Sequence, residues 1–92
     1  MKTYVGDIGT EIILECGMDI SDGTGYDIAY KKPDGAEGVW NGALEGTTQV
    51  KYTTVEGDLD QAGDYRLQPL LTLTGWVGRG ETAIFPVFRH WE

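Results

Sequence analysis

The chain contains a single cysteine, Cys16, and only three prolines among its 92 residues. One cysteine cannot form an internal disulfide, which excludes the small secreted domains that several bridges hold together. No apolar run approaches the ~18–20 residues of a membrane-spanning helix, and the first residues lack the ~7–15-residue apolar region of a secretory signal. We therefore expect a protein that folds in a reducing cytoplasm, with no membrane segment and no export signal.

Basic residues are also scarce, because seven Lys and Arg stand against 15 Asp and Glu and give a net charge of −8. A broad nucleic-acid interface would repel phosphates at long range, so we expect no nucleic-acid partner. A chain of this length has apolar mass for one core only. Residues 1–92 are therefore predicted to form a single domain.

Glycine, in contrast, is abundant, with 14 residues scattered along the chain. Glycine and proline interrupt the sequence so often that the longest segment free of both is residues 47–56. This segment is rich in Thr and Val, whose branched side chains pack well on a pleated sheet and lose rotamer freedom in a helix. The sequence predicts essentially no α-helix.

Alternating apolar residues predict short strands instead. In residues 10–16, Ile12, Leu14 and Cys16 share one face, and Glu11, Ile13 and Glu15 lie on the other. Comparable patterns recur in residues 26–32, 48–55, 64–73 and 81–88. About seven short strands at ~8–12-residue spacing are typical of a β-sandwich.

The connections between these strands are also predicted. Tyr4 and Val5 form a short opening strand, and Ile20 points inward from a turn-rich connector. The turn at residues 32–35 leads into a strand over residues 37–44. Residues 74–80 form a loop before the last strand, where Pro86 indicates a sheet edge or bulge because it cannot donate a ladder hydrogen bond.

Residues 60–65, Asp-Gln-Ala-Gly-Asp-Tyr, are similar to the corner that opens strand F of immunoglobulin-like domains. The resemblance implies a structural corner made by Asp60, Gly63 and Tyr65, with the Tyr65 hydroxyl turned back onto nearby backbone. Leu67 stands where immunoglobulins have a disulfide cysteine; Cys16 could match the other cysteine, and Tyr30 would stand near the usual core Trp. The resemblance implies an all-β, Ig-like antiparallel β-sandwich without a disulfide.

A closer resemblance covers most of the chain and is carried by residues 6–12, 30–35 and 58–63, together with Trp40. These segments resemble small tailed-phage virion proteins related to the N-terminal domain of the baseplate upper protein family. The resemblance implies a non-enzymatic structural protein of the virion, made in the bacterial host cytoplasm, that docks onto other phage virion proteins. A tail, baseplate or fibre-attachment component and a capsid decoration protein of the same fold both remain open, and we expect a homo-oligomer without a cofactor.

The chain has few candidate chemical sites. Asp58, Asp60 and Asp64 lie close in sequence and could coordinate Ca²⁺, but the spacing lacks the Gly and later Glu of a calcium loop. This favours a turn cap at Asp60, solvated side chains at Asp58 and Asp64, and no metal. His90, the only histidine, lies near the C-terminus, so a catalytic arrangement with Cys16 is not expected. The Gly-rich residues 75–80 precede a strand rather than a helix, which indicates a hairpin loop and not a dinucleotide site.

Aromatic and Arg residues are the candidates for an interface, because such residues concentrate binding energy. They are Trp76, Arg79, Trp40, Phe88 and Trp91. Alternatively, Trp76 folds over one end of the sandwich and Trp91 covers an open edge. A function of another class, a carbohydrate-binding module, would use Trp40, Trp76 and Tyr residues as exposed stacking platforms.

Overall fold

A computed structural model describes all 92 residues as strands, turns and bends, with no helix. The predicted all-β class is confirmed, although there are eight strands where about seven were expected. They are β1 (Glu11–Glu15), β2 (Gly25–Lys31), β3 (Glu37–Trp40), β4 (Ala43–Glu45), β5 (Gln49–Thr53), β6 (Gly63–Leu73), β7 (Trp76–Arg79) and β8 (Ala83–Val87). No helix that could cross a lipid bilayer is present.

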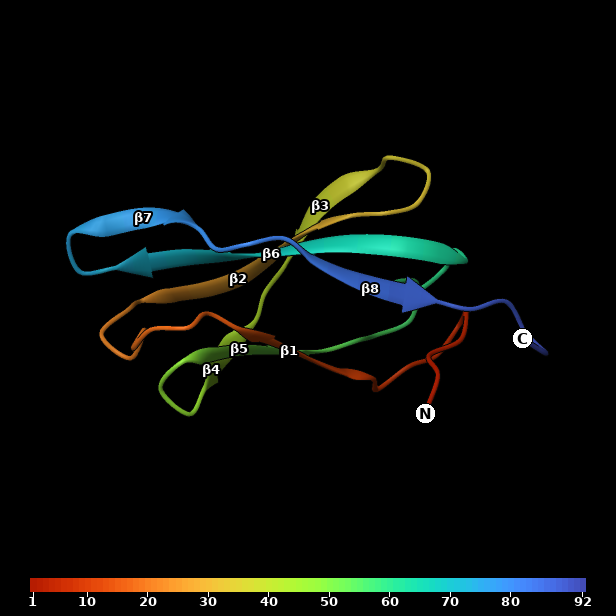
Figure 1. Cartoon of the computed structure of the whole chain (residues 1–92), viewed down its shortest axis with the longest axis horizontal. Coiled ribbons are helices and arrows are strands. Elements are labelled where there is room, and N and C mark those ends of the chain that lie inside the picture. The colour runs from red at the N-terminus through yellow and green to blue at the C-terminus, as the bar shows by residue number, and fades with distance from the viewer.

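The strands form two antiparallel sheets that lie one over the other (Figure 1). One sheet has the order β1-β5-β4, and the other has the order β3-β2-β6-β7 with β8 also paired to β6. These orders correspond to B-E-D and C′-C-F-G of a variable-type immunoglobulin sandwich, which confirms the predicted fold. The predicted opening strand is reduced to one parallel bridge between Tyr4 and Phe88.

Strand β6 is the longest element and the centre of the five-stranded sheet. Its alternate residues Tyr65, Leu67 and Leu71 are buried between the sheets, as the spacing predicts. β2 pairs with one edge of β6 from Arg66 to Thr72. The opposite edge is shared, because β8 pairs with its first half and β7 with its second half.

Pro69 lies where β6 changes partner from β8 to β7. Its carbonyl accepts a hydrogen bond from the Gly80 N–H at 2.9 Å. In an antiparallel strand the N–H and C=O of one residue point to the same side. The Pro69 carbonyl points toward Gly80, so the N–H that proline lacks would also point that way, and no hydrogen bond to β2 is lost. A Cβ on Gly80 would lie 2.5 Å from Pro69 Cγ, so glycine lets the chain cross close to the proline ring.

Two predicted segments are wrong in their boundaries. Residues 37–44 do not form one strand, because the chain leaves the five-stranded sheet after β3 and enters the other sheet as β4. Gly42 permits this crossing, since a Cβ there would lie 2.5 Å from the Tyr26 carbonyl oxygen. Residues 74–80 are not simply a loop: Thr74 and Gly75 form a tight turn, with Gly75 at a φ of 77°, and β7 follows at once.

Eleven buried apolar residues form a single core between the sheets. Ile20 is fully buried, as predicted for an inward-pointing residue of the connector. Cys16 lies at the margin of this core and is only half-buried. No buried side-chain nitrogen or oxygen lacks a hydrogen-bond partner, so the interior is satisfied without a ligand.

Candidate functional site

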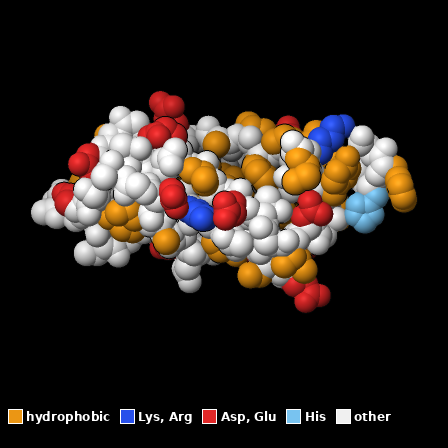
Figure 2. Space-filling model, turned by 90° about the horizontal axis from the view of Figure 1, so that it is seen from below, with side chains coloured by type: hydrophobic (Ala, Val, Ile, Leu, Met, Phe, Trp, Pro, Cys, Tyr) orange, Lys and Arg blue, Asp and Glu red, His pale blue; other side chains and the backbone are white.

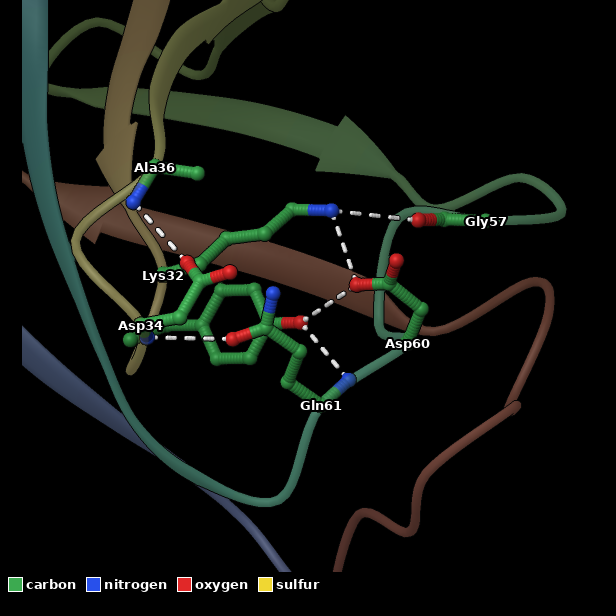
Figure 3. A network of polar contacts seen from close by, with 7 residues as sticks. Lys32, Asp34, Ala36, Gly57, Asp60 and Gln61 are labelled. Atoms are coloured by element: carbon green, nitrogen blue, oxygen red, sulfur yellow. Dashed lines mark hydrogen bonds and ion pairs between the residues drawn. The ribbon is translucent and has the colours of Figure 1, made fainter.

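The predicted corner joins the turn after β2 to the segment before β6 (Figure 3). The Gln61 N–H donates to the Tyr65 hydroxyl at 3.3 Å, and this hydroxyl lies 3.4 Å from Asp60 Oδ1. Gly63 has a φ of 129°, and a Cβ there would lie 2.9 Å from the Pro33 ring. The hydroxyl of Tyr65 is thus turned back onto backbone, as the resemblance implied.

Lys32 extends this corner with an ion pair. Its Nζ lies 2.8 Å from Asp60 Oδ1 and 3.4 Å from the Gly57 carbonyl oxygen. The bond from Lys32 holds the pKa of the Asp60 carboxyl below its usual value, and the same bond raises the pKa of Lys32. The Asp34 N–H donates to the Gln61 side chain at 3.1 Å and makes a second link between the two turns. These contacts join the turn after β2 to the segment before β6.

Trp40 is wrong as a surface candidate, because only 5% of it is exposed. Its ring stacks between Tyr30 of the five-stranded sheet, at 4.7 Å between centroids, and Tyr52 of the three-stranded sheet, at 5.0 Å. Trp40 therefore packs across the two sheets from strand β3. Tyr30 was expected near the position of the core Trp, and it lies directly against the tryptophan that fills the core.

Trp76 and Arg79 are at the two ends of β7 and not in a loop. Trp76 is 46% exposed and faces the same side of the sheet as its partner Leu73, with its ring over Gly78. Arg79 faces the opposite side, where its guanidinium donates to Gln68 Oε1 at 3.1 Å. The two candidates therefore belong to different faces and cannot form one contact patch.

Phe88 and Trp91 lie at the end of the molecule that also holds the N-terminus (Figure 1). Phe88 is half-buried, packs against Tyr4 and has Lys2 Nζ 4.6 Å from its ring centroid. Trp91 is fully exposed and has a φ of 75°, so it does not cover a sheet edge within this chain. His90 Nε2 lies 2.8 Å from the Val5 carbonyl oxygen and ties the two ends together.

The three clustered aspartates do not converge. Asp58 Oδ2 accepts hydrogen bonds from the Tyr52 hydroxyl at 2.6 Å and from the Val55 N–H at 2.8 Å. Asp60 pairs with Lys32, and Asp64 is exposed on β6. No group of three or more His, Cys, Asp or Glu side chains is placed to hold a metal ion. Asp64 is solvated as expected, but Asp58 is not, because it is half-buried and accepts two hydrogen bonds.

Cys16 and His90 make separate local contacts. Burial raises the pKa of the Cys16 thiol, and its Sγ lies 4.0 Å from the Leu14 carbonyl oxygen. The raised pKa favours the thiol over the nucleophilic thiolate at neutral pH. His90 contacts the N-terminal segment through Val5, so neither residue is oriented toward the other by these bonds.

A hollow of about 380 Å³ on the outer face of the five-stranded sheet is the feature that sequence analysis missed. Ala29 and Gln68 lie side by side at its centre, because they are register partners of β2 and β6. One carboxylate borders it, that of Glu37, which is the register partner of Lys31. Three cations also border it: Lys31, Arg66 and Arg79. None of them has a carboxylate oxygen within 4.0 Å, since the ion pairs of the chain involve only Lys32 and Lys51.

Exposed apolar side chains flank this hollow. Val39 lies on β3, Ile84 on β8 and Val77 on β7, and each is more than half exposed. All three are on the outer side of the sheet, because their register partners face outward. Val39 pairs with Ala29, Ile84 with Arg66, and Val77 with Thr72. The alternation in the sequence signals an outward direction for each of these residues, but only the pairing of strands brings them onto one face.

The outer face of the three-stranded sheet is different (Figure 2). Lys51 stands between two acidic side chains there, with its Nζ 3.3 Å from Glu11 and 3.9 Å from Glu45. Apolar side chains gather on this side toward the end with the termini. The basic side chain on this sheet is therefore paired, whereas the three that border the hollow are not.

Comparisons with protein-family models, with curated proteins and with solved structures found no match to this chain.

Proposed function

We propose that this protein is a non-enzymatic virion structural protein of a tailed phage that docks onto neighbouring subunits. The observation that carries the docking role is the outer face of the five-stranded sheet, where exposed Val39, Val77 and Ile84 surround cations without ionic partners. Apolar patches with Arg residues are characteristic of protein interfaces. The assignment to a phage particle is supported by the resemblance of residues 6–12, 30–35 and 58–63 to phage virion proteins.

A tail, baseplate or fibre-attachment position is the first form of this proposal, and capsid decoration is the alternative within the same class. Both use the same docking face and differ in the number of copies in each particle. The partners would be other virion proteins, with further copies of this chain as neighbours in a homo-oligomer.

A carbohydrate-binding module is less well supported. Stacking platforms for sugars need exposed aromatic rings on one face, but Trp40 is in the core and Trp76 lies on the opposite side of its sheet from the hollow. The exposed residues of the docking face are aliphatic, charged or, like Thr72 and Thr82, small and polar.

Quantitative mass spectrometry of purified particles tests this proposal. We expect the chain to be present at a fixed copy number, and that number distinguishes a tail position from capsid decoration. A particle assembled with Val39→Asp and Ile84→Asp should lose the protein, whereas Ile13→Asp on the other sheet should retain it. Absence of the unaltered chain from particles would refute the proposal.

A further inference from the structure

We infer that the hollow bordered by Lys31, Arg66 and Arg79 binds an extended acidic segment of a partner protein. The inference rests on the proposed docking function and specifies the chemistry of the partner. Its basis is the contrast between a chain of net charge −8 and a hollow bordered by three of its seven basic residues and one carboxylate, Glu37, with no ion pair among them.

Lys31 has charged register partners on both sides, Glu37 on β3 and Arg66 on β6, and its contact with Arg66 is the unfavourable one. The two residues are register partners on β2 and β6, so two positive side chains leave the same face directly opposite each other. Like charges in this position destabilise an antiparallel pair. A carboxylate bound between them would turn this repulsion into two charge-assisted contacts.

Arg79 supplies a second cation at a defined place. Its guanidinium bonds Gln68 Oε1 at 3.1 Å, and the amide of Gln68 donates to Thr82 Oγ1 at 3.0 Å. This chain of bonds holds the guanidinium over β6 two residues along from Arg66. A guanidinium fixed by one bond keeps further N–H groups that can bind a carboxylate in a bidentate manner.

The spacing of the cations indicates the form of the ligand. Positions two residues apart on a strand are separated by roughly 6.6 Å, and side chains on one face of an extended peptide repeat at the same interval. Acidic residues at alternate positions of an extended segment therefore match the two cationic positions. Val39 and Ala29 line the hollow between them and suit the aliphatic stems of Glu side chains.

The test is an NMR titration of the full chain with a short peptide of alternating Glu and Thr, at low and at high salt. We expect saturable shifts of the backbone amides of Lys31, Arg66, Gln68 and Arg79, which weaken with salt. Arg66→Gln and Arg79→Gln should each reduce the affinity by about tenfold, because each loses a hydrogen-bonded charge pair. Arg89→Gln removes an arginine outside the hollow and should leave the affinity unchanged. A peptide of alternating Gln and Thr should not bind.

Several outcomes would overturn the inference. Equal affinity of the unaltered chain and the Arg66→Gln and Arg79→Gln variants would exclude the hollow as the site. Inorganic phosphate that binds as tightly as the peptide would identify a simple anion site, and self-association of the chain that depends on Arg66 would identify a second copy as the occupant. If Arg66→Gln and Arg79→Gln enter particles normally while Val39→Asp does not, the docking function stands and this inference fails.

Discussion

Tyr65 combines a role in the core with a role at the corner. Its ring is fully buried, and its hydroxyl is the acceptor for the Gln61 N–H at the corner before β6. A Phe at this position would keep the ring but leave the backbone donor and the Asp60 carboxylate without this partner. The corner is therefore held by hydrogen bonding as well as by burial.

We predict that Tyr65→Phe lowers the free energy of unfolding by about 1 kcal/mol, as is typical when a partly buried donor loses its acceptor. Urea unfolding followed by Trp fluorescence measures this change. Tyr4→Phe is the control, because no hydrogen bond involves the Tyr4 hydroxyl. Equal stabilities of the two variants would contradict a structural role for the corner hydroxyl.

Tyr52 gives a prediction in alkaline solution. Burial, and then its hydrogen bond to Asp58, raise the pKa of Tyr52 to about 12. The unfolded chain has a Tyr pKa of ~10, so the folded state binds the proton more tightly and stability falls as the pH rises from ~10 to about 12. Thermal unfolding midpoints across this range should fall, and less steeply in Tyr52→Phe. The pKa of Tyr65 is also raised, so some dependence should remain in that variant.

The resemblance of residues 60–65 was enough to anticipate the corner, because Asp60, Gly63 and Tyr65 lie within a few residues of one another, but it did not reveal the links from Lys32 and Asp34. Trp40 could not be placed in the same way. Its burial depends on Tyr52, which reaches it from the other sheet, and on a change of sheet at Gly42 that short-range patterns do not signal. At the scale of the residue, local contacts were predictable and contacts between sheets were not.

At the scale of the element, β6 organises the fold because two strands share one of its edges. Pro69 interrupts that edge where β8 gives way to β7, and Gly80 lets the connecting chain pass against the proline ring. The two residues are thus complementary, although they are separated in sequence by the whole of the β6–β7 hairpin.

We predict that Gly80→Ala destabilises the protein by about 1–3 kcal/mol, because its Cβ overlaps Pro69 and forces a backbone shift. In a Pro69→Ala background the same substitution should cost less, since the overlapping Cγ is absent. The difference is the coupling energy of a double-mutant cycle, measured by urea unfolding. Additive effects of the two substitutions would show that the crossing is not limited by this contact.

The alternation of apolar residues placed β1, β2, β5, β6 and β8 correctly because each has one face in the core. β7 was mistaken for part of a loop, since only its pairing with β6 distinguishes Trp76–Arg79 from a Gly-rich connection. The hollow was missed for the same reason. Lys31, Arg66 and Arg79 come from three strands. The strand register that brings them together cannot be predicted from the sequence of any one segment.

At the scale of the whole molecule, the few basic residues differ in the charges that surround them. Lys51 lies between two glutamates on one sheet, whereas Arg66 faces Lys31 on the other. A protein of strongly negative charge should gain stability from each positive charge if only the total mattered. The local register predicts a different result for these two positions.

We predict that Arg66→Glu and Lys51→Glu change stability in opposite directions, although each lowers the net charge by the same amount. Arg66→Glu replaces a like-charged pair with an opposite-charged pair and should stabilise by roughly 0.2–1 kcal/mol. Lys51→Glu removes two exposed ion pairs and creates repulsion with Glu11 and Glu45, so it should destabilise by about 1 kcal/mol. Unfolding in urea at low salt measures both changes, and added salt at ~1 M should bring them closer together because it screens exposed charges. Equal destabilisation by both variants would mean that the total charge, and not the cross-strand arrangement of Lys31 and Arg66, governs this surface.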